Sequence, residues 1–196
     1  EIKEIVKTKR IFARVSPQNK VQLVNALQAN GNVVAMTGDG VNDAPAIKNA
    51  DIGISMGVTG TDVAKDTADM ILVDDNFATI VNAVEEGRVI FSNIKKFVSF
   101  LLSCNIAEVL IVFLSILFGL PSPLTPIQLL WLNLVTDAFP ALALGVEPAE
   151  ADIMQRPPRD PNESILAGET GKNVILQSIA ITISVLAAYV IGLNYI

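Results

Sequence analysis

Residues 36–45 read Met-Thr-Gly-Asp-Gly-Val-Asn-Asp-Ala-Pro, an acidic turn that follows the short apolar run 32–35. An apolar run that ends in glycines and aspartates predicts a strand that delivers a loop to one edge of a sheet. Gly38 and Gly40 permit positive φ angles and a close approach of the backbone to a ligand. We therefore expect this turn to carry chemistry and its neighbours to form an α/β domain.

Short apolar runs and amphipathic stretches alternate on both sides of this turn. The expected strands are 11–15, 32–36, 51–56 and 70–73, and the expected helices are 20–29, 44–49 and 61–69. Alternation at this spacing predicts a parallel sheet with helices on its faces. Ligands of such sheets bind beyond the carboxyl ends of the strands, which is where residues 37–43 lie.

The side chains of the turn suit a phosphate bound together with a metal ion. Asp39 and Asp43 offer hard oxygen ligands that fit Mg²⁺ bridging to a phosphate. Asn42 can donate a hydrogen bond to a phosphoryl oxygen without adding charge. The alternative interpretation is that these residues only form a turn.

The composition limits the class of protein. The 196 residues are 51% hydrophobic with a mean hydropathy of +0.49, which is too apolar for an ordinary soluble domain. The net charge is −6 and the sequence has no cluster of basic residues that could neutralise phosphates, so no nucleic acid is expected as a partner. The sequence has no histidine and the single cysteine Cys104, which excludes imidazole metal sites, Ser-His-Asp triads and an internal disulfide.

The second half of the sequence has the pattern of transmembrane helices. Residues 97–119 contain one charge and are long enough to cross a bilayer core of about 30 Å. The helical stretch 76–96 leads into them without a proline, which predicts one long helix; this helix could act as a mechanical strut or be merely a solvated spacer. The expected organisation is an α/β domain 1–75, a stalk helix 76–96, transmembrane helices 97–119, 127–146 and 173–196, an extracytoplasmic turn 120–126, and a loop 147–172. Basic residues flank one side only, so we expect the α/β domain and this loop to be cytoplasmic.

Polar side chains interrupt two of these spans. Asn105 and Glu108 share one helix face, and Asn133, Thr136 and Asp137 share another. A carboxylate near the bilayer centre costs several kcal/mol unless it has a partner. Neither span contains a lysine or arginine, so a bound hard cation such as Ca²⁺ is the expected partner. Hydrogen bonding between helices is the alternative, and it explains the two carboxylates poorly.

Two stretches of the first half resemble a known family. Residues 37–46 look like the hinge motif of P-type cation-transporting ATPases, and residues 14–20 resemble the lysine-bearing motif that precedes it. The resemblance implies a haloacid-dehalogenase-like, Rossmann-like fold in which Asp39 holds Mg²⁺ and Lys20 neutralises charge on the phosphoryl group. The family's Asp-Lys-Thr-Gly-Thr and Thr-Gly-Glu motifs do not occur here. We therefore expect a piece of a longer chain that binds ATP mainly elsewhere and does not hydrolyse it alone.

The membrane half resembles the sarco/endoplasmic-reticulum type of calcium pump within that family. Residues 103–108 and 130–137 look like its fifth and sixth membrane helices, and residues 152–159 look like its next cytoplasmic loop. The resemblance implies that transported Ca²⁺ is coordinated by Asn105, Glu108, Asn133, Thr136 and Asp137. It also implies a cell membrane or calcium-storing membrane, and as partners the pump's actuator, nucleotide-binding domain and other membrane helices.

Several alternatives stay open at the level of sequence. Glu147, Glu150 and Asp152 could attract cations or simply face water, and Gln155 stands where the family often has a further acid. A pump for Mn²⁺ has overlapping ligand preferences. A passive cation channel or ion-binding membrane protein would carry a catalytically inactive α/β domain. A membrane-tethered phosphatase would leave the membrane carboxylates unexplained.

Overall fold

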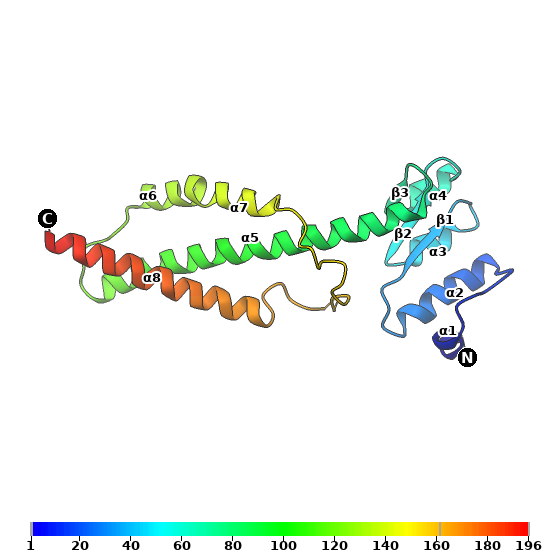
Figure 1. Ribbon diagram of the computed structural model, residues 1–196, viewed down its shortest axis with the longest axis horizontal. Coiled ribbons are helices and arrows are strands. Elements are labelled where there is room, and N and C mark those ends of the chain that lie inside the picture. Colours follow the sequence, from blue (N-terminus) through cyan, green and yellow to red (C-terminus); the bar gives the residue numbers. More distant parts are fainter. Residues whose placement is uncertain (1, 161, 196) are drawn as a thin grey trace. The chain divides into compact units, whose positions relative to one another are not determined.

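A computed structural model describes residues 2–160 and 162–195, which divide into two compact units, 1–83 and 84–196. The first unit holds a small sheet with helices around it, and the helix α5 (Phe77–Leu117) also begins there (Figure 1). In chain order the elements before α5 are α1 (Ile2–Thr8), α2 (Pro17–Gln28), β1 (Ala35–Gly38), α3 (Ala44–Asn49), β2 (Ile52–Met56), α4 (Asp62–Thr67) and β3 (Met70–Leu72). The strands form a parallel sheet in the order β1-β2-β3, which confirms the predicted α/β fold.

Local sequence explains where these elements begin and end. Ser16 caps α2 by accepting a 3.2 Å hydrogen bond from the Asn19 amide, and Pro17 occupies the first turn. The chain leaves α2 through Gly31, whose φ of 83° favours glycine. Ile47 of α3, Ile54 of β2 and Leu72 of β3 are fully buried. Their burial holds helix and sheet together.

The predicted strand at 11–15 is wrong. Residues 9–16 are irregular, Ile11 is 90% exposed, and Arg14 has a φ of 53°. A strand needs a neighbouring strand to form hydrogen bonds with its backbone N–H and C=O groups. Among the described residues no strand lies beside residues 11–15. The expected strand at 32–36 lies later, at Ala35–Gly38, because the Val34 amide instead donates to the Asp51 carboxylate at 2.8 Å. Helix α1 was not predicted.

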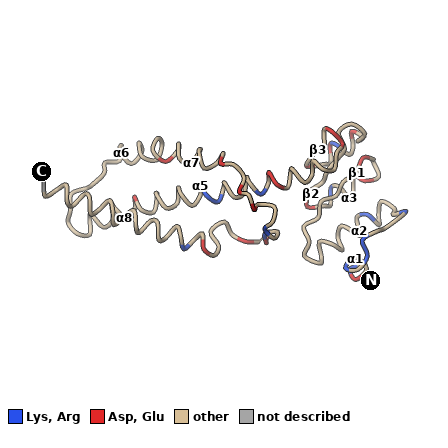
Figure 2. Tube along the Cα trace, in the orientation of Figure 1, with Lys and Arg blue, Asp and Glu red and all other residues tan. Residues whose placement is uncertain are grey.

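The second unit is built around long apolar helices. Helix α5 (Phe77–Leu117) begins within the first unit and runs for 41 residues without a break, as the sequence predicted. The other elements are α6 (Pro126–Trp131), the π-helix η1 (Leu132–Thr136), α7 (Ala138–Gly145) and α8 (Glu169–Tyr195). Three helical segments are long and apolar enough to cross a membrane: Phe77–Leu117, Pro126–Gly145 and Glu169–Asn194. Charged residues are sparse along them, except in the first half of α5, before residue 97 (Figure 2).

Hydroxyl groups in the apolar helices bond back to their own helix. Ser103 of α5 and Ser178 and Thr182 of α8 donate to carbonyls four residues earlier at 2.7 Å. Ser103 also donates to the Gln177 side chain of α8 at 3.1 Å, which joins the two helices. Unlike the regular helix expected over 127–146, the second apolar segment is interrupted by η1.

Candidate functional sites

The first site is the turn between β1 and α3, and its central feature is an ion pair. Lys20 lies in α2 and Asp43 immediately precedes α3, and the Lys20 ammonium pairs with the Asp43 carboxylate. Asp43 is only 7% exposed. It occupies the cap position of α3 but its side chain does not cap that helix. The Asp43 carboxylate therefore pairs with Lys20 instead of capping the helix.

The glycines of the turn have different steric roles. A Cβ at position 38 would lie 2.5 Å from the Asp43 Cβ and 2.9 Å from its Oδ2. At Gly40 the nearest atom to such a Cβ is 3.9 Å away. Gly38 is thus required by the packing of Asp43, whereas Gly40 leaves open space beside the backbone.

Asp39 and Asn42 are exposed in the same turn, beyond the carboxyl end of β1. Among the described residues neither side chain makes a hydrogen bond, so both remain available to a ligand. The Asp39 carbonyl accepts a 2.8 Å hydrogen bond from the Thr61 amide. The Asp39 carboxylate, which makes no hydrogen bond among the described residues, offers the oxygen ligands that Mg²⁺ prefers.

The second site lies in the apolar helices of the second unit. The Asn133 side-chain amide donates to Glu108 Oε2 at 2.8 Å and to the Leu129 carbonyl at 3.0 Å. The structure therefore brings Asn133 of η1 and Glu108 of α5 together. The Asn105 amide instead donates to the Leu101 carbonyl of its own helix at 2.8 Å, and Thr136 is exposed.

Asp137 follows the π-helix, and its side chain is buried. The Asp137 amide bonds the Leu132 carbonyl five residues earlier at 2.9 Å, which is the π-helical register. Pro140 has no N–H to donate to the Thr136 carbonyl four residues before it. Asp137 is 6% exposed, and within the described residues its Oδ2 makes no hydrogen bond. A buried carboxylate without a hydrogen bond is costly in free energy unless a cation binds it or a proton neutralises it.

The described residues do not complete a metal cage by themselves. No group of three His, Cys, Asp or Glu side chains among them is placed to hold a metal ion. A cation at Glu108 and Asp137 would therefore need amide, hydroxyl or backbone oxygens, or ligands from elsewhere in a longer chain.

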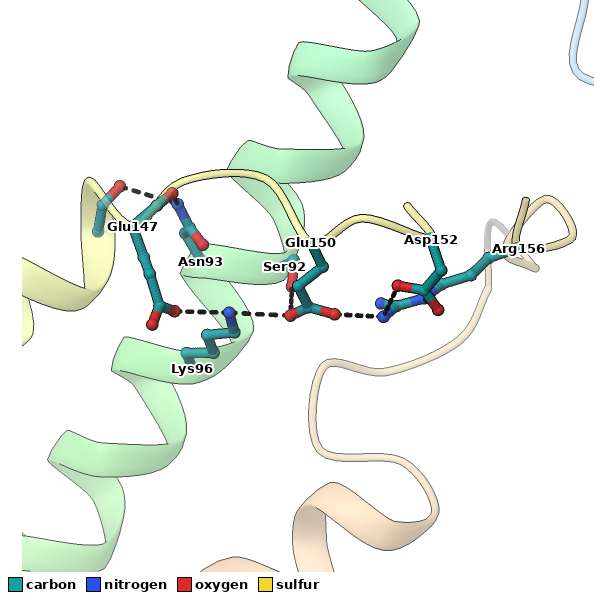
Figure 3. A network of polar contacts seen from close by, with 8 residues as sticks. Ser92, Asn93, Lys96, Glu147, Glu150, Asp152 and Arg156 are labelled. Atoms are coloured by element: carbon teal, nitrogen blue, oxygen red, sulfur yellow. Dashed lines mark hydrogen bonds and ion pairs between the residues drawn. The ribbon is translucent and has the colours of Figure 1, made fainter. Parts of the chain in front are cut away.

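A third cluster joins the start of the apolar part of α5 to the loop after α7 (Figure 3). Lys96 pairs with Glu147 at 2.6 Å and with Glu150 at 2.9 Å. Arg156 pairs with Glu150 and, at 2.8 Å, with Asp152. Hydrogen bonds from Lys96 and then Arg156 lower the pKa of Glu150 to about 2. These acids are thus bound to basic residues of this chain.

Backbone contacts reinforce this cluster. Asn93 donates to the Glu147 carbonyl at 2.7 Å, and Arg88 donates to the carbonyls of Ile153 and Arg156 at 2.9 and 2.8 Å. Two turns of α5 therefore hold one face of the 145–156 loop.

Comparisons with known proteins place this chain in a family. Residues 121–196 match the model described as "Cation transporting ATPase, C-terminus", and residues 2–51 match that of the haloacid dehalogenase-like hydrolases. A calcium-transporting ATPase of Bacillus subtilis is 52% identical over 97% of this chain and 22% of its own. The chain belongs to the cation-transporting ATPases.

Two further proteins are similar to this chain. The endoplasmic reticulum calcium ATPase srcA of Aspergillus fumigatus is 57% identical over 84% of this cation-transporting ATPase chain and 17% of its own. The crystal structure of a zinc-transporting PIB-type ATPase in the E2.Pi state is 35% identical, with a TM-score of 0.48, covering 66% of this chain and 19% of that one. The chain spans about a fifth of the length of the curated relatives it matches. With its three apolar helices it is a segment of a multi-pass membrane protein.

Two features of this cation-transporting ATPase segment were not predicted from its sequence. Pro140 shortly after Asn133 is a signal for an irregular helix, yet it does not say that the irregularity is a π-helix ending beside Asp137. The pairing of Lys96 with Glu147 has no local signal, because 51 residues separate the partners.

Proposed function

We propose that the complete protein is an ATP-driven pump that moves Ca²⁺ out of the cytoplasm through an aspartyl-phosphate formed outside this segment. The observation that carries the proposal is the buried Asp137 carboxylate, whose Oδ2 has no partner among the described residues and which lies in an apolar helical segment. The relatives named calcium-transporting ATPases support Ca²⁺ as the ion. In the alternative, a passive channel with a catalytically inactive α/β domain, the Lys20–Asp43 ion pair would have no catalytic role.

At the phosphate end, each residue of the turn has a proposed role. Lys20, held by Asp43, stabilises negative charge on the transferring phosphoryl group. Asn42 donates a hydrogen bond to a phosphoryl oxygen, and the Gly40 backbone approaches the ligand closely because nothing fills the space beside it. Asp39 would hold Mg²⁺, which when bound neutralises charge on the phosphate oxygens.

At the membrane end, Glu108 and Asp137 supply the charge that binds the transported ion. Asn105, Asn133 and Thr136 supply neutral oxygens, so that the shell suits a hard cation with several oxygen ligands. The 2.8 Å hydrogen bond holds Asn133 beside Glu108. When an ion binds, the Asn133 side chain would turn its carbonyl oxygen toward the ion in place of its NH₂ group.

The two ends would be coupled by α5. A continuous helix of 41 residues, about 60 Å at 1.5 Å per residue, can transmit a displacement from residues near 77 to Glu108. We place residues 1–75, 76–96 and 147–172 in the cytoplasm, with 120–126 on the other side. The remainder of the pump would supply the phosphorylated aspartate, the nucleotide site and further ion ligands.

The test uses the complete protein in sealed vesicles. ATP-driven uptake of Ca²⁺ and, separately, of Mn²⁺ is measured for the wild type and for Asp137→Asn, with Glu163→Gln of the 147–172 loop as a matched control. We expect Ca²⁺ uptake that requires ATP, is lost in Asp137→Asn and persists in Glu163→Gln. Uptake without ATP would establish a channel instead, and uptake of Mn²⁺ alone would change the ion.

A further inference from the structure

Asp75 lies between β3 and α5 and uses both of its carboxylate oxygens to bind one loop. Oδ1 accepts hydrogen bonds from the Gly57 and Val58 amides at 2.7 and 3.0 Å. Oδ2 accepts from the Thr59 amide and the Thr59 hydroxyl, both at 2.8 Å. The backbone of Asp75 has a φ of 50°, a left-handed conformation that a non-glycine residue keeps only when its surroundings determine it.

The bound loop, residues 57–60, packs closely against the backbone of the sheet. The Gly57 amide bonds the Leu72 carbonyl of β3 at 2.8 Å, and a Cβ on Gly57 would lie 2.6 Å from that carbonyl oxygen. A Cβ on Gly60 would lie 2.0 Å from the Met56 carbonyl oxygen. Glycine is needed at both positions because backbone approaches backbone there.

This loop leads directly to the turn that carries Asp39. The next residue, Thr61, donates its amide to the Asp39 carbonyl at 2.8 Å. The Thr61 hydroxyl also caps α4 by accepting from the Ala64 amide. The described contacts thus form a chain from the Asp75 carboxylate through residues 57–59 to Thr61 and then to the Asp39 backbone.

We propose that Asp75 is a positioning residue for Asp39: by clamping residues 57–59 it fixes Thr61, and Thr61 fixes the turn from which the Asp39 carboxylate projects. The inference deepens the proposed function, on which it rests only in taking Asp39 as the Mg²⁺ ligand. The pKa of Asp75 is lowered to about 2 by the backbone and hydroxyl hydrogen bonds of the loop, so the clamp is charged at every working pH.

Asp74 provides a matched control. Its carboxylate accepts from the Asn76 amide at 3.1 Å and the Thr79 hydroxyl at 2.7 Å, and so serves only the start of α5. Asp75→Asn and Asp74→Asn therefore make the same chemical change at adjacent residues, and only the first reaches the 57–60 loop. An asparagine at position 75 has one side-chain oxygen in place of two, and its NH₂ group cannot accept a hydrogen bond. It would therefore lose some of the hydrogen bonds from the three amides and the Thr59 hydroxyl.

The first measurement is hydrogen–deuterium exchange of the complete protein without Mg²⁺, which does not depend on activity. In Asp75→Asn we expect faster exchange in residues 57–61 and also in residues 37–43, whereas Asp74→Asn changes only residues near 74–80. Faster exchange confined to 57–61 would overturn the proposal, because the clamp would then not reach the Asp39 turn.

The second measurement is the Mg²⁺ concentration that half-saturates phosphoenzyme formation from ATP. We expect it to rise about tenfold or more in Asp75→Asn and to stay unchanged in Asp74→Asn, as for other partners that orient a metal ligand. An unchanged value in Asp75→Asn overturns the positioning role. A wild type that forms no phosphoenzyme would overturn the proposed function, and the exchange experiment would still decide the clamp.

Thr59→Val is the milder variant if Asp75→Asn fails to fold. It removes one of the four donors, the hydroxyl, and leaves the backbone bonds in place. We expect the same two changes with smaller size, about two- to threefold in Mg²⁺ requirement. Wild-type behaviour of Thr59→Val in both measurements would count against the proposal.

Discussion

The Asn133 side-chain amide donates a 2.8 Å hydrogen bond to the Glu108 carboxylate, and this bond joins η1 to α5 inside the apolar part of the chain. An amide that faces a carboxylate in this way stabilises the charge in the absence of an ion. It also holds in place the two side chains whose oxygens a cation would need.

Replacement of Glu108 by Gln should weaken cation binding. The variant keeps the shape of the side chain and a hydrogen-bonding oxygen for Asn133 but removes one of two carboxylates. We expect the Ca²⁺ concentration for half-maximal ATPase activity of the complete protein to rise at least about tenfold, since ligand charge sets Ca²⁺ affinity. Glu86→Gln, an exposed change on the same helix, should leave it unaltered. Equal affinities for Glu108→Gln and the wild type would show that Glu108 is not an ion ligand.

Pro140→Ala tests the π-helix. Alanine restores an N–H that can donate to the Thr136 carbonyl, and a regular helix through this point becomes more favourable by up to about 3 kcal/mol. We expect the thermal unfolding midpoint to be kept or raised while Ca²⁺ affinity falls about threefold or more. The exposed Leu142→Ala on the same helix is the control. Wild-type affinity in Pro140→Ala would show that the π-helical register is not needed for ion binding.

Gly38→Ala and Gly40→Ala should differ although they lie two residues apart. The new methyl group at position 38 overlaps the Asp43 side chain, an overpacking that costs about 1–3 kcal/mol and displaces the partner of Lys20. At position 40 the methyl group meets no atom closer than 3.9 Å. Thermal unfolding of the complete protein should therefore shift for Gly38→Ala only. A loss of phosphoenzyme in Gly40→Ala with unchanged unfolding would place a ligand against that residue.

The Glu150 cluster predicts a defined dependence on pH. Because the pKa of Glu150 is lowered to about 2 in the folded protein from an ordinary 4.5, the cluster contributes stability above about pH 4.5 and loses it as the pH falls toward 2. Glu150→Gln should thus lower the unfolding midpoint by the same small amount, about 1–3 °C, at pH values of about 7.5 and 5.5. The difference from wild type should shrink below about pH 4.5.

Glu163→Gln lies in the same loop and serves as the control for this pH dependence. Its unfolding midpoint should follow that of the wild type throughout. If the effect of Glu150→Gln grew rather than shrank in acid, the assigned ion pairs with Lys96 and Arg156 would be wrong.

Local sequence was sufficient for features that depend on neighbours along the chain. The helix expected over 44–49 is α3 with the same bounds, because Pro45 suits a first helical turn. The apolar length of 97–119 and the absence of a breaker before it predicted the continuous α5. The acidic turn does follow a strand as expected, since glycine and aspartate act on the backbone within a few residues, although β1 includes the first residues of the stretch, 36–38.

Other features depend on contacts between distant residues and were out of reach. The run 11–15 has strand composition, but no neighbouring strand pairs with it among the described residues, so it stays irregular. Lys20 and Asp43 are 23 residues apart, and only the packing of α2 beside α3 shows that they form a pair. The same holds for Lys96 with Glu147 and for Asp75 with the 57–59 loop.

Composition and motifs were enough to identify the chemical groups of this protein: a turn suited to binding phosphate, apolar helices that suit a membrane, and carboxylates inside those helices with no lysine or arginine in the same span. The tertiary structure decided how those groups are used. It buries Asp137 next to a π-helix, directs Asn133 to Glu108, and assigns the acids of the 147–152 stretch to Lys96 and Arg156. The physical reason is that composition and periodicity act over a few residues, whereas burial and ion pairing depend on which distant surfaces meet.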